Sequence, residues 1–197
     1  MNLTYENEII ISGTIVHKFC NEKVTILTIS TGMMNNYVQY PTFYFFGEKG
    51  KEVAETFDQY DAVTAIGNIQ SSVNRSSGKI HQIIFGENIK LELPDVPKDT
   101  LIFGHQTFKK RNFVKISGLV RNVTAHTKFV DIILETHKNG RLSTVRTRRY
   151  TDNPQALAEK IKQNVYISTI GSIQTNMEEK NGKKMYYEDV ILSKVAA

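Results

Sequence analysis

The sequence repeats itself. Three short motifs return in the same order: Ile11-Ser12-Gly13 as Ile116-Ser117-Gly118, 66–70 as 170–174, and Ser77-Gly78-Lys79 as Asn181-Gly182-Lys183. The offsets are 105, 104 and 104 residues. Motifs that recur in order at nearly constant spacing indicate a duplicated structural unit. The 197 residues are therefore expected to form two copies of one small domain.

Within each copy, stretches rich in β-branched residues alternate with turn residues, which predicts an all-β chain with short helices. In the first copy, strands are predicted at 8–16, 23–30, 37–46, 62–70 and 79–85. A helix at 48–59 follows the third strand, because apolar residues recur there at helical spacing. In the second copy, strands are predicted at 114–123, 129–136, 142–150, 165–174 and 184–192, with a helix over 154–163.

Three strands, a helix and two strands is the order of a five-stranded OB barrel. The predicted fold is therefore two tandem five-stranded OB-fold barrels, each with a helix between strands 3 and 4. Gly13 and Gly118 lie inside the two first strands, where glycine permits the bulge that a small barrel needs. We predict a first domain at 1–93, a linker at 94–112 and a second domain at 113–197.

Charge is divided unevenly between the two halves. Residues 1–97 contain 7 Lys and Arg against 11 Asp and Glu, whereas residues 98–197 contain 18 against 9. The net charge of +5 favours a polyanionic partner. A field that attracts phosphate must come mainly from the second half.

Three ordered motifs of the first copy lie at Phe43-Tyr44-Phe45-Phe46-Gly47-Glu48-Lys49, at 66–70 and at 83–91. In these motifs the first copy resembles the bacterial and phage single-stranded DNA-binding (SSB) protein family. The resemblance covers about 80 residues of each copy, and it is weaker in the second, where Tyr150-Thr151 replaces Phe46-Gly47. Typical members carry one OB domain and form tetramers, so this chain looks like a fused dimer. It ends in Lys194-Val195-Ala196-Ala197 rather than in an acidic tip, which argues against tail-mediated recruitment.

The third strand of the first copy carries candidate stacking residues. Alternation along a strand places Tyr40, Tyr44 and Phe46 on one face and Phe43 and Phe45 on the other. The resemblance implies stacking aromatics at Tyr40 and Phe46. We assign the first three residues to a DNA face and the two phenylalanines to the core, and add Tyr37 as a further platform. The alternative is that these rings all belong to a core or a subunit interface.

The same register in the second copy aligns Thr144, Arg146, Arg148 and Tyr150. Arginine can pair with phosphate or lie flat on a base, so Arg146, Arg148 and Tyr150 are candidate DNA contacts. We expect the first copy to supply stacking and the second to supply most phosphate contacts. A solvated basic strand remains the alternative. The inward position of Arg149 fits this register poorly unless it covers a barrel end.

Loop cations complete the predicted site. The family uses the hairpin between strands 4 and 5 to grip DNA, which implies roles for Arg75 and Lys79 in the first copy and for Lys183 and Lys184 in the second. Lys138 and Arg141 flank the predicted turn at Asn139-Gly140 before the third strand of the second copy. Ordinary exposed hairpin charge is the alternative for each.

The sequence indicates no enzyme, metal or cofactor. It contains no phosphate-binding loop motif, and its five histidines lack metal-ligand spacing. No apolar run approaches the roughly 20 residues that span a membrane, no signal peptide is visible, and the single Cys20 favours a reducing cytoplasm. We expect sequence-independent binding of single-stranded DNA in replication, recombination or conjugative transfer, and a phage or mobile-element origin. Candidate protein partners are a second copy of the chain and replication or recombination proteins. The alternatives are an OB-fold assembly module and an RNA-binding protein.

Overall fold

A computed structural model describes residues 4–31, 33–34, 37–73, 80–92, 111–180 and 182–196. The chain forms two compact units that interleave in sequence. Unit 1 comprises 1–9, 68–84 and 113–197, and unit 2 comprises 10–67 and 85–112. Most of the predicted linker at 94–112 lies outside the described residues, so the predicted domain boundaries stay a prediction.

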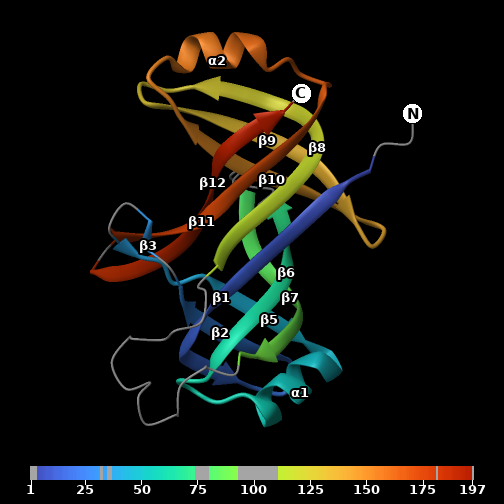
Figure 1. Cartoon of the computed structure of the whole chain (residues 1–197), viewed down its shortest axis with the longest axis vertical. Coiled ribbons are helices and arrows are strands. Elements are labelled where there is room, and N and C mark those ends of the chain that lie inside the picture. The colour runs from blue at the N-terminus through green and yellow to red at the C-terminus, as the bar shows by residue number, and fades with distance from the viewer. Residues whose placement is uncertain are drawn as a thin grey trace. The chain divides into compact units, whose positions relative to one another are not determined.

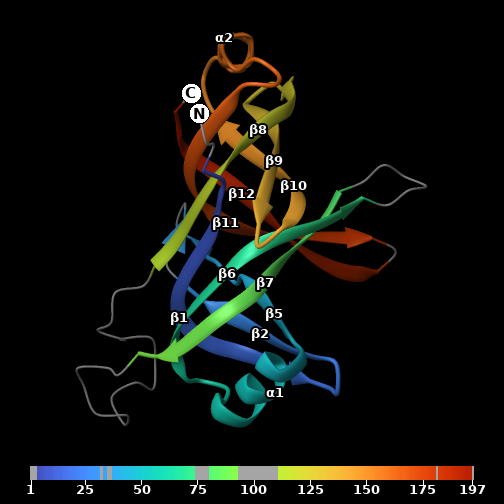
Figure 2. The same ribbon diagram turned by 90° about the vertical axis from the view of Figure 1, so that its right-hand side faces the viewer.

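Five strands, most of whose residues belong to unit 2, form a closed barrel (Figure 1). Strands β1 (Glu6–Cys20), β2 (Val24–Ser30), β5 (Thr42–Phe46), β7 (Ile80–Leu91) and β6 (Ala62–Val73) pair in that order, and β6 pairs back with β1. Helix α1 (Gly47–Thr56) lies at one end of this barrel (Figure 2). Lys18 fixes the end of α1, because its ammonium group donates to the carbonyl oxygens of Ala54 and Phe57. The expected all-β fold with a closed barrel and short helices is confirmed.

The strands of unit 1 pair in an equivalent order. Strands β8 (Arg111–Ala125), β9 (Phe129–Lys138), β10 (Arg141–Tyr150), β12 (Lys183–Ala196) and β11 (Tyr166–Lys180) are neighbours in turn, and β11 returns to pair with β8. Strands β10 and β12 run parallel. Helix α2 (Pro154–Lys160) begins after Asn153, whose side chain caps it by accepting from the backbone N–H of Ala156. Neither helix in the described ranges is long and apolar enough to cross a membrane.

The third strand of the first copy is shorter than predicted. Only β5, from Thr42 to Phe46, joins the barrel, while Met33–Met34 (β3) and Tyr37–Val38 (β4) form a separate two-stranded sheet. The physical reason is Pro41, which has no N–H to donate to a ladder of hydrogen bonds. Its carbonyl oxygen still accepts from the backbone N–H of Ile29.

Gly13 and Gly118 each allow a neighbouring strand to approach closely. A Cβ atom at Gly13 would lie 2.0 Å from the carbonyl oxygen of Ser30, and one at Gly118 would lie 2.2 Å from that of Glu135. The predicted bulges come slightly later, where the register shifts between Ile15 and His17 in β1 and between Val120 and Asn122 in β8. The spacing from glycine to bulge is the same in β1 and β8.

Candidate nucleic-acid interface

The outer face of β5 carries two aromatic rings, one partly buried and one exposed. Phe43 and Phe45 are fully buried, and Tyr44 and Phe46 alternate with them on the outer side. Phe46 keeps 40% of its surface exposed, although an isolated phenylalanine gains free energy when it is buried. The division of this strand into a core face and an outer face follows the register expected from its pleat.

Three rings on this face lie nearly parallel, and we call Tyr44, Phe46 and Phe85 the aromatic row. The ring centroids of Tyr44 and Phe46 are 6.5 Å apart, those of Phe46 and Phe85 are 5.7 Å apart, and each pair of planes meets at 15°. Phe85 was not predicted. The alternation along β7 could have identified it, because Phe85 lies between the buried residues Ile84 and Gly86 and must therefore face outward.

Two further predicted tyrosines lie before β5. Tyr40 is 44% exposed and precedes Pro41, so it stands outside the barrel strand. Tyr37 belongs to the small β3–β4 sheet and is 74% exposed. Both rings are accessible, but neither belongs to the aromatic row.

Strand β10 has the alternation that the sequence predicted. Ser143, Val145 and Thr147 are buried, while the intervening positions carry partly exposed side chains, including Arg146 and Arg148. Tyr150 ends the strand and is exposed. Arg149 is partly exposed, and its guanidinium group donates to the carbonyl oxygen of Leu192 at 2.8 Å. That contact accounts for an inward-directed arginine near a strand end.

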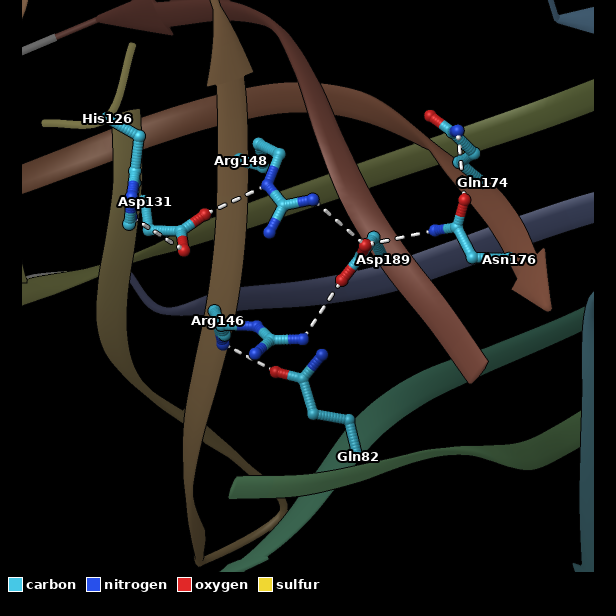
Figure 3. A network of polar contacts seen from close by, with 8 residues as sticks. All are labelled: Gln82, His126, Asp131, Arg146, Arg148, Gln174, Asn176 and Asp189. Atoms are coloured by element: carbon cyan, nitrogen blue, oxygen red, sulfur yellow. Dashed lines mark hydrogen bonds and ion pairs between the residues drawn. The ribbon is translucent and has the colours of Figure 1, made fainter. Parts of the chain in front are cut away.

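Both outward arginines of β10 are bound to carboxylates (Figure 3). The Arg148 guanidinium contacts Asp131 at 3.0 Å and Asp189 at 3.3 Å, and Arg146 contacts the second Asp189 oxygen at 3.1 Å. The Asn176 amide also donates to Asp189, at 3.0 Å. Asp189 is only 3% exposed, and a buried carboxylate needs such partners. The expected pair of cations is thus a network of two arginines and two aspartates.

The network holds Arg148 in its charged form. Burial acts to lower the pKa of its guanidinium, but the hydrogen bond with Asp131 and the charges of Asp189 and Asp131 outweigh burial and raise this pKa. The guanidinium carbon also lies 4.1 Å from the centroid of the Phe129 ring, a cation–π contact. Arg148 is therefore fixed on several sides.

A second group of rings surrounds Phe129, and we call His126, Phe129 and Tyr150 the Phe129 cluster. The His126 ring stacks on Phe129 with centroids 4.4 Å apart, and Tyr150 meets Phe129 edge-on at 5.7 Å. Phe129 and Tyr150 face each other across the β9–β10 ladder. Sequence reasoning named only Tyr150, although Phe129 could have been found as its partner once the Asn139-Gly140 turn fixed the hairpin register.

The turn end of the β9–β10 hairpin contacts other parts of unit 1. Asn139 and Gly140 both have positive φ angles, as a tight two-residue turn requires. Arg141 donates to the Gln70 side chain at 2.9 Å, and the backbone N–H of Arg146 donates to the Gln82 side chain. Lys138 is partly exposed opposite Arg141. These contacts place the two predicted cations at the hairpin turn, away from the Phe129 cluster at the other end of β10.

The remaining predicted cations cannot be placed in the same way. Arg75 and Lys79 lie outside the described residues. Lys183 and Lys184 begin β12, but the structure describes only their backbone, paired with 180 and 179 of β11. The same hairpin bears three exposed side chains that sequence reasoning missed, Met177, Tyr186 and Tyr187.

Two crystal structures with a similar fold are those of the single-stranded DNA-binding protein from Thermus aquaticus. A deletion variant of that protein matches with a TM-score of 0.71 and 10% identity, over 98% of this chain and 94% of the other. The wild-type protein matches with a TM-score of 0.70 and 11% identity, over 98% and 93%. At such low identity the likeness establishes the fold alone, and at that level it confirms the resemblance seen in the sequence. No protein-family model and no curated protein matches the chain.

Proposed function

We propose that this protein binds single-stranded DNA without sequence preference, as a non-enzymatic tandem OB-fold protein that requires no cofactor. The observation that carries the proposal is the aromatic row on the outer face of β5 and β7. Its three rings share nearly one orientation, with adjacent planes at 15°. Every base has a flat face, so stacking tolerates any sequence, at roughly 1–3 kcal/mol per base.

The fold supports this role. The outer face of strands 2 and 3 is where OB barrels bind oligonucleotides, and the aromatic row lies on the third strand of its barrel with Phe85 from a neighbouring strand. The solved protein with the similar fold is itself named a single-stranded DNA-binding protein. The excess of Lys and Arg in the second half would attract the phosphate chain.

The finer parts of the proposal concern cellular context. We propose a cytoplasmic protein that coats and protects single strands during replication, recombination or conjugative transfer. A homodimer through barrel surfaces and contacts with replication or recombination proteins belong to the same proposal.

Competition binding tests the proposal. A labelled oligo-dT of about 30 nucleotides would be titrated with the whole protein, since OB folds occupy roughly 4–16 nucleotides each. We expect unlabelled oligo-dT to compete much better than duplex DNA of the same length. Equal competition by duplex, or no binding, would contradict the proposal, and stronger competition by oligo-rU would assign the site to RNA.

A further inference from the structure

On the β9–β10 face of unit 1, nearby aspartates offset the positive charges of the arginines. Arg146 and Arg148 contribute two positive charges, and Asp131 and Asp189 contribute two negative charges within 3.3 Å of them. The side chains of Arg148 and Asp131 are 21% and 18% exposed, so water screens this pair less than a surface pair. With His126, whose Nε2 lies 3.4 Å from Asp131, in its uncharged form, the network is formally neutral, and its arginines already have carboxylate partners.

A phosphate contact at these arginines would require exchange of partners. Phosphate gains free energy from arginine mainly by pairing with an uncompensated charge and releasing counterions from DNA. Here Asp189 holds both guanidinium groups, and Asn176 holds Asp189 in place. Moving the arginines would leave a buried carboxylate short of partners, which is costly.

The Phe129 cluster lies beside this network on the same face. Tyr150 is 45% exposed, the His126 side chain is 41% exposed, and both rest on Phe129. Phe129 is itself braced by Arg148, which Asp131 fixes. The rings are thus held by the ion network, with open surface toward solvent.

We propose that the β9–β10 face of unit 1 is an electroneutral nucleobase-binding site, in which an unpaired base stacks on the Phe129 cluster while Asp131 and Asp189 cancel the charges of Arg148 and Arg146. This proposal rests on the proposed function and names the ligand chemistry of its second face. Arg146 and Arg148 act as positioning residues that brace the rings. The aspartates keep this face from drawing phosphate.

The test measures oligo-dT affinity at several salt concentrations for wild type, for three variants of this face and for Tyr44→Ala in the aromatic row. Phe129→Ala and Tyr150→Ala should each weaken binding about 5- to 150-fold, the equivalent of one lost stacked base, without changing the slope of log K against log salt. The double variant Arg146→Gln/Asp189→Asn removes one charge of each sign. Its slope should equal that of wild type, whereas a lost phosphate contact would reduce the slope by about 0.7.

Each result separates this site from the general proposal. A slope reduced by about 0.7 in the double variant would overturn electroneutrality, and wild-type affinity in Tyr150→Ala would overturn the stacking site. If Tyr44→Ala weakens binding and Tyr150→Ala does not, only this inference fails. If wild type does not bind oligo-dT, both fail. Thermal melts check folding, and because Tyr150 is exposed, its variant stays informative even if Phe129→Ala unfolds.

Discussion

The outer faces of β5 and β10 show how one scaffold can present two chemistries. Their ladders are equivalent: Phe46 faces Val24 as Tyr150 faces Phe129, and Tyr44 faces Ile26 as Arg148 faces Asp131. The repeat offset of 104 residues also matches Phe85 with Asp189. The aromatic row of unit 2 therefore corresponds to an arginine, a tyrosine and a buried aspartate in unit 1.

The charge that a strand presents depends on the partners of its charged side chains on neighbouring strands. Strand β5 keeps rings where β10 has guanidinium groups, and β7 has a ring where β12 has the carboxylate that binds them. The differences at the two pairs of strands therefore match each other. An arginine beside Asp189 has a carboxylate partner, whereas an arginine beside a phenylalanine would have no such partner and could bind phosphate. Residues 98–197 are basic overall, yet the two arginines and two aspartates of this network carry equal and opposite charge.

The largest expected effect concerns the shared scaffold. Gly118→Ala and Gly13→Ala should each cost about 3 kcal/mol of unfolding free energy, because the new Cβ would overlap a carbonyl oxygen of the neighbouring strand. Urea unfolding measures the loss. Gly140→Asn is the control, because asparagine tolerates the positive φ of that turn. A large loss in only one of the two alanine variants would break the equivalence of the copies.

The next effect concerns the aromatic row. Phe46→Ala and Tyr44→Ala should each cost about 1–3 kcal/mol of oligo-dT binding, with an unchanged salt slope, because a stacked base is lost and no phosphate contact is. Tyr60→Ala is a matched control, since Tyr60 is 73% exposed in the same unit but lies outside the row. Equal losses in the control and the row variants would remove the row from the site.

A smaller effect is expected at Phe85. Its ring supports Phe46 from a neighbouring strand, and aromatic pairs contribute about 0.5–1.5 kcal/mol beyond their buried area. Phe85→Ala should therefore weaken oligo-dT binding less than Phe46→Ala does. A loss in Phe85→Ala larger than that in Phe46→Ala would make Phe85 the principal platform. Fluorescence anisotropy titrations would rank the two.

The smallest expected effect concerns the lowered pKa values of two glutamates, one in each unit. A hydrogen bond from Thr64 lowers the pKa of Glu92 in unit 2, and one from Arg121 lowers the pKa of Glu135 in unit 1. A lowered carboxyl pKa stabilises the fold above the ordinary value of about 4.3, and this gain is lost as pH falls through the lower folded pKa.

Glu92→Gln should therefore cost about 1 kcal/mol or less at pH 7 and a smaller amount at pH 3. Urea unfolding at the two pH values measures the difference, with Glu55→Gln, at an exposed position of α1, as the control. A cost that grows on acidification would contradict the assigned sign.

Much of the fold could be predicted because it depends on local patterns and on the repeat. The strand order, the two helices and the faces of β5 and β10 follow from alternation and turn residues. The predicted length of the third strand in the first copy is wrong, because Pro41 has no N–H to donate to the ladder. The strands β11 and β12 extend beyond their predicted ends into a long hairpin.

The site could be predicted only in part. The rings of β5 and the arginines of β10 were found because they lie within single strands. Phe85, Asp131 and Asp189 were missed because each acts across strands, and cross-strand partners depend on barrel closure and register. A sequence gives the charge of Arg146 directly, but only pairing in space reveals that Asp189 cancels it.

Photo-crosslinking of the whole protein to oligo-dT that carries 5-iodouracil can identify the aromatic rings on which the bases stack. Bases that stack on aromatic rings react with them, and peptide mass spectrometry locates the adducts. We predict adducts at Tyr44, Phe46 or Phe85 in unit 2 and at Tyr150, Phe129 or His126 in unit 1. Adducts confined to other surfaces, such as that of Tyr60, would contradict the account.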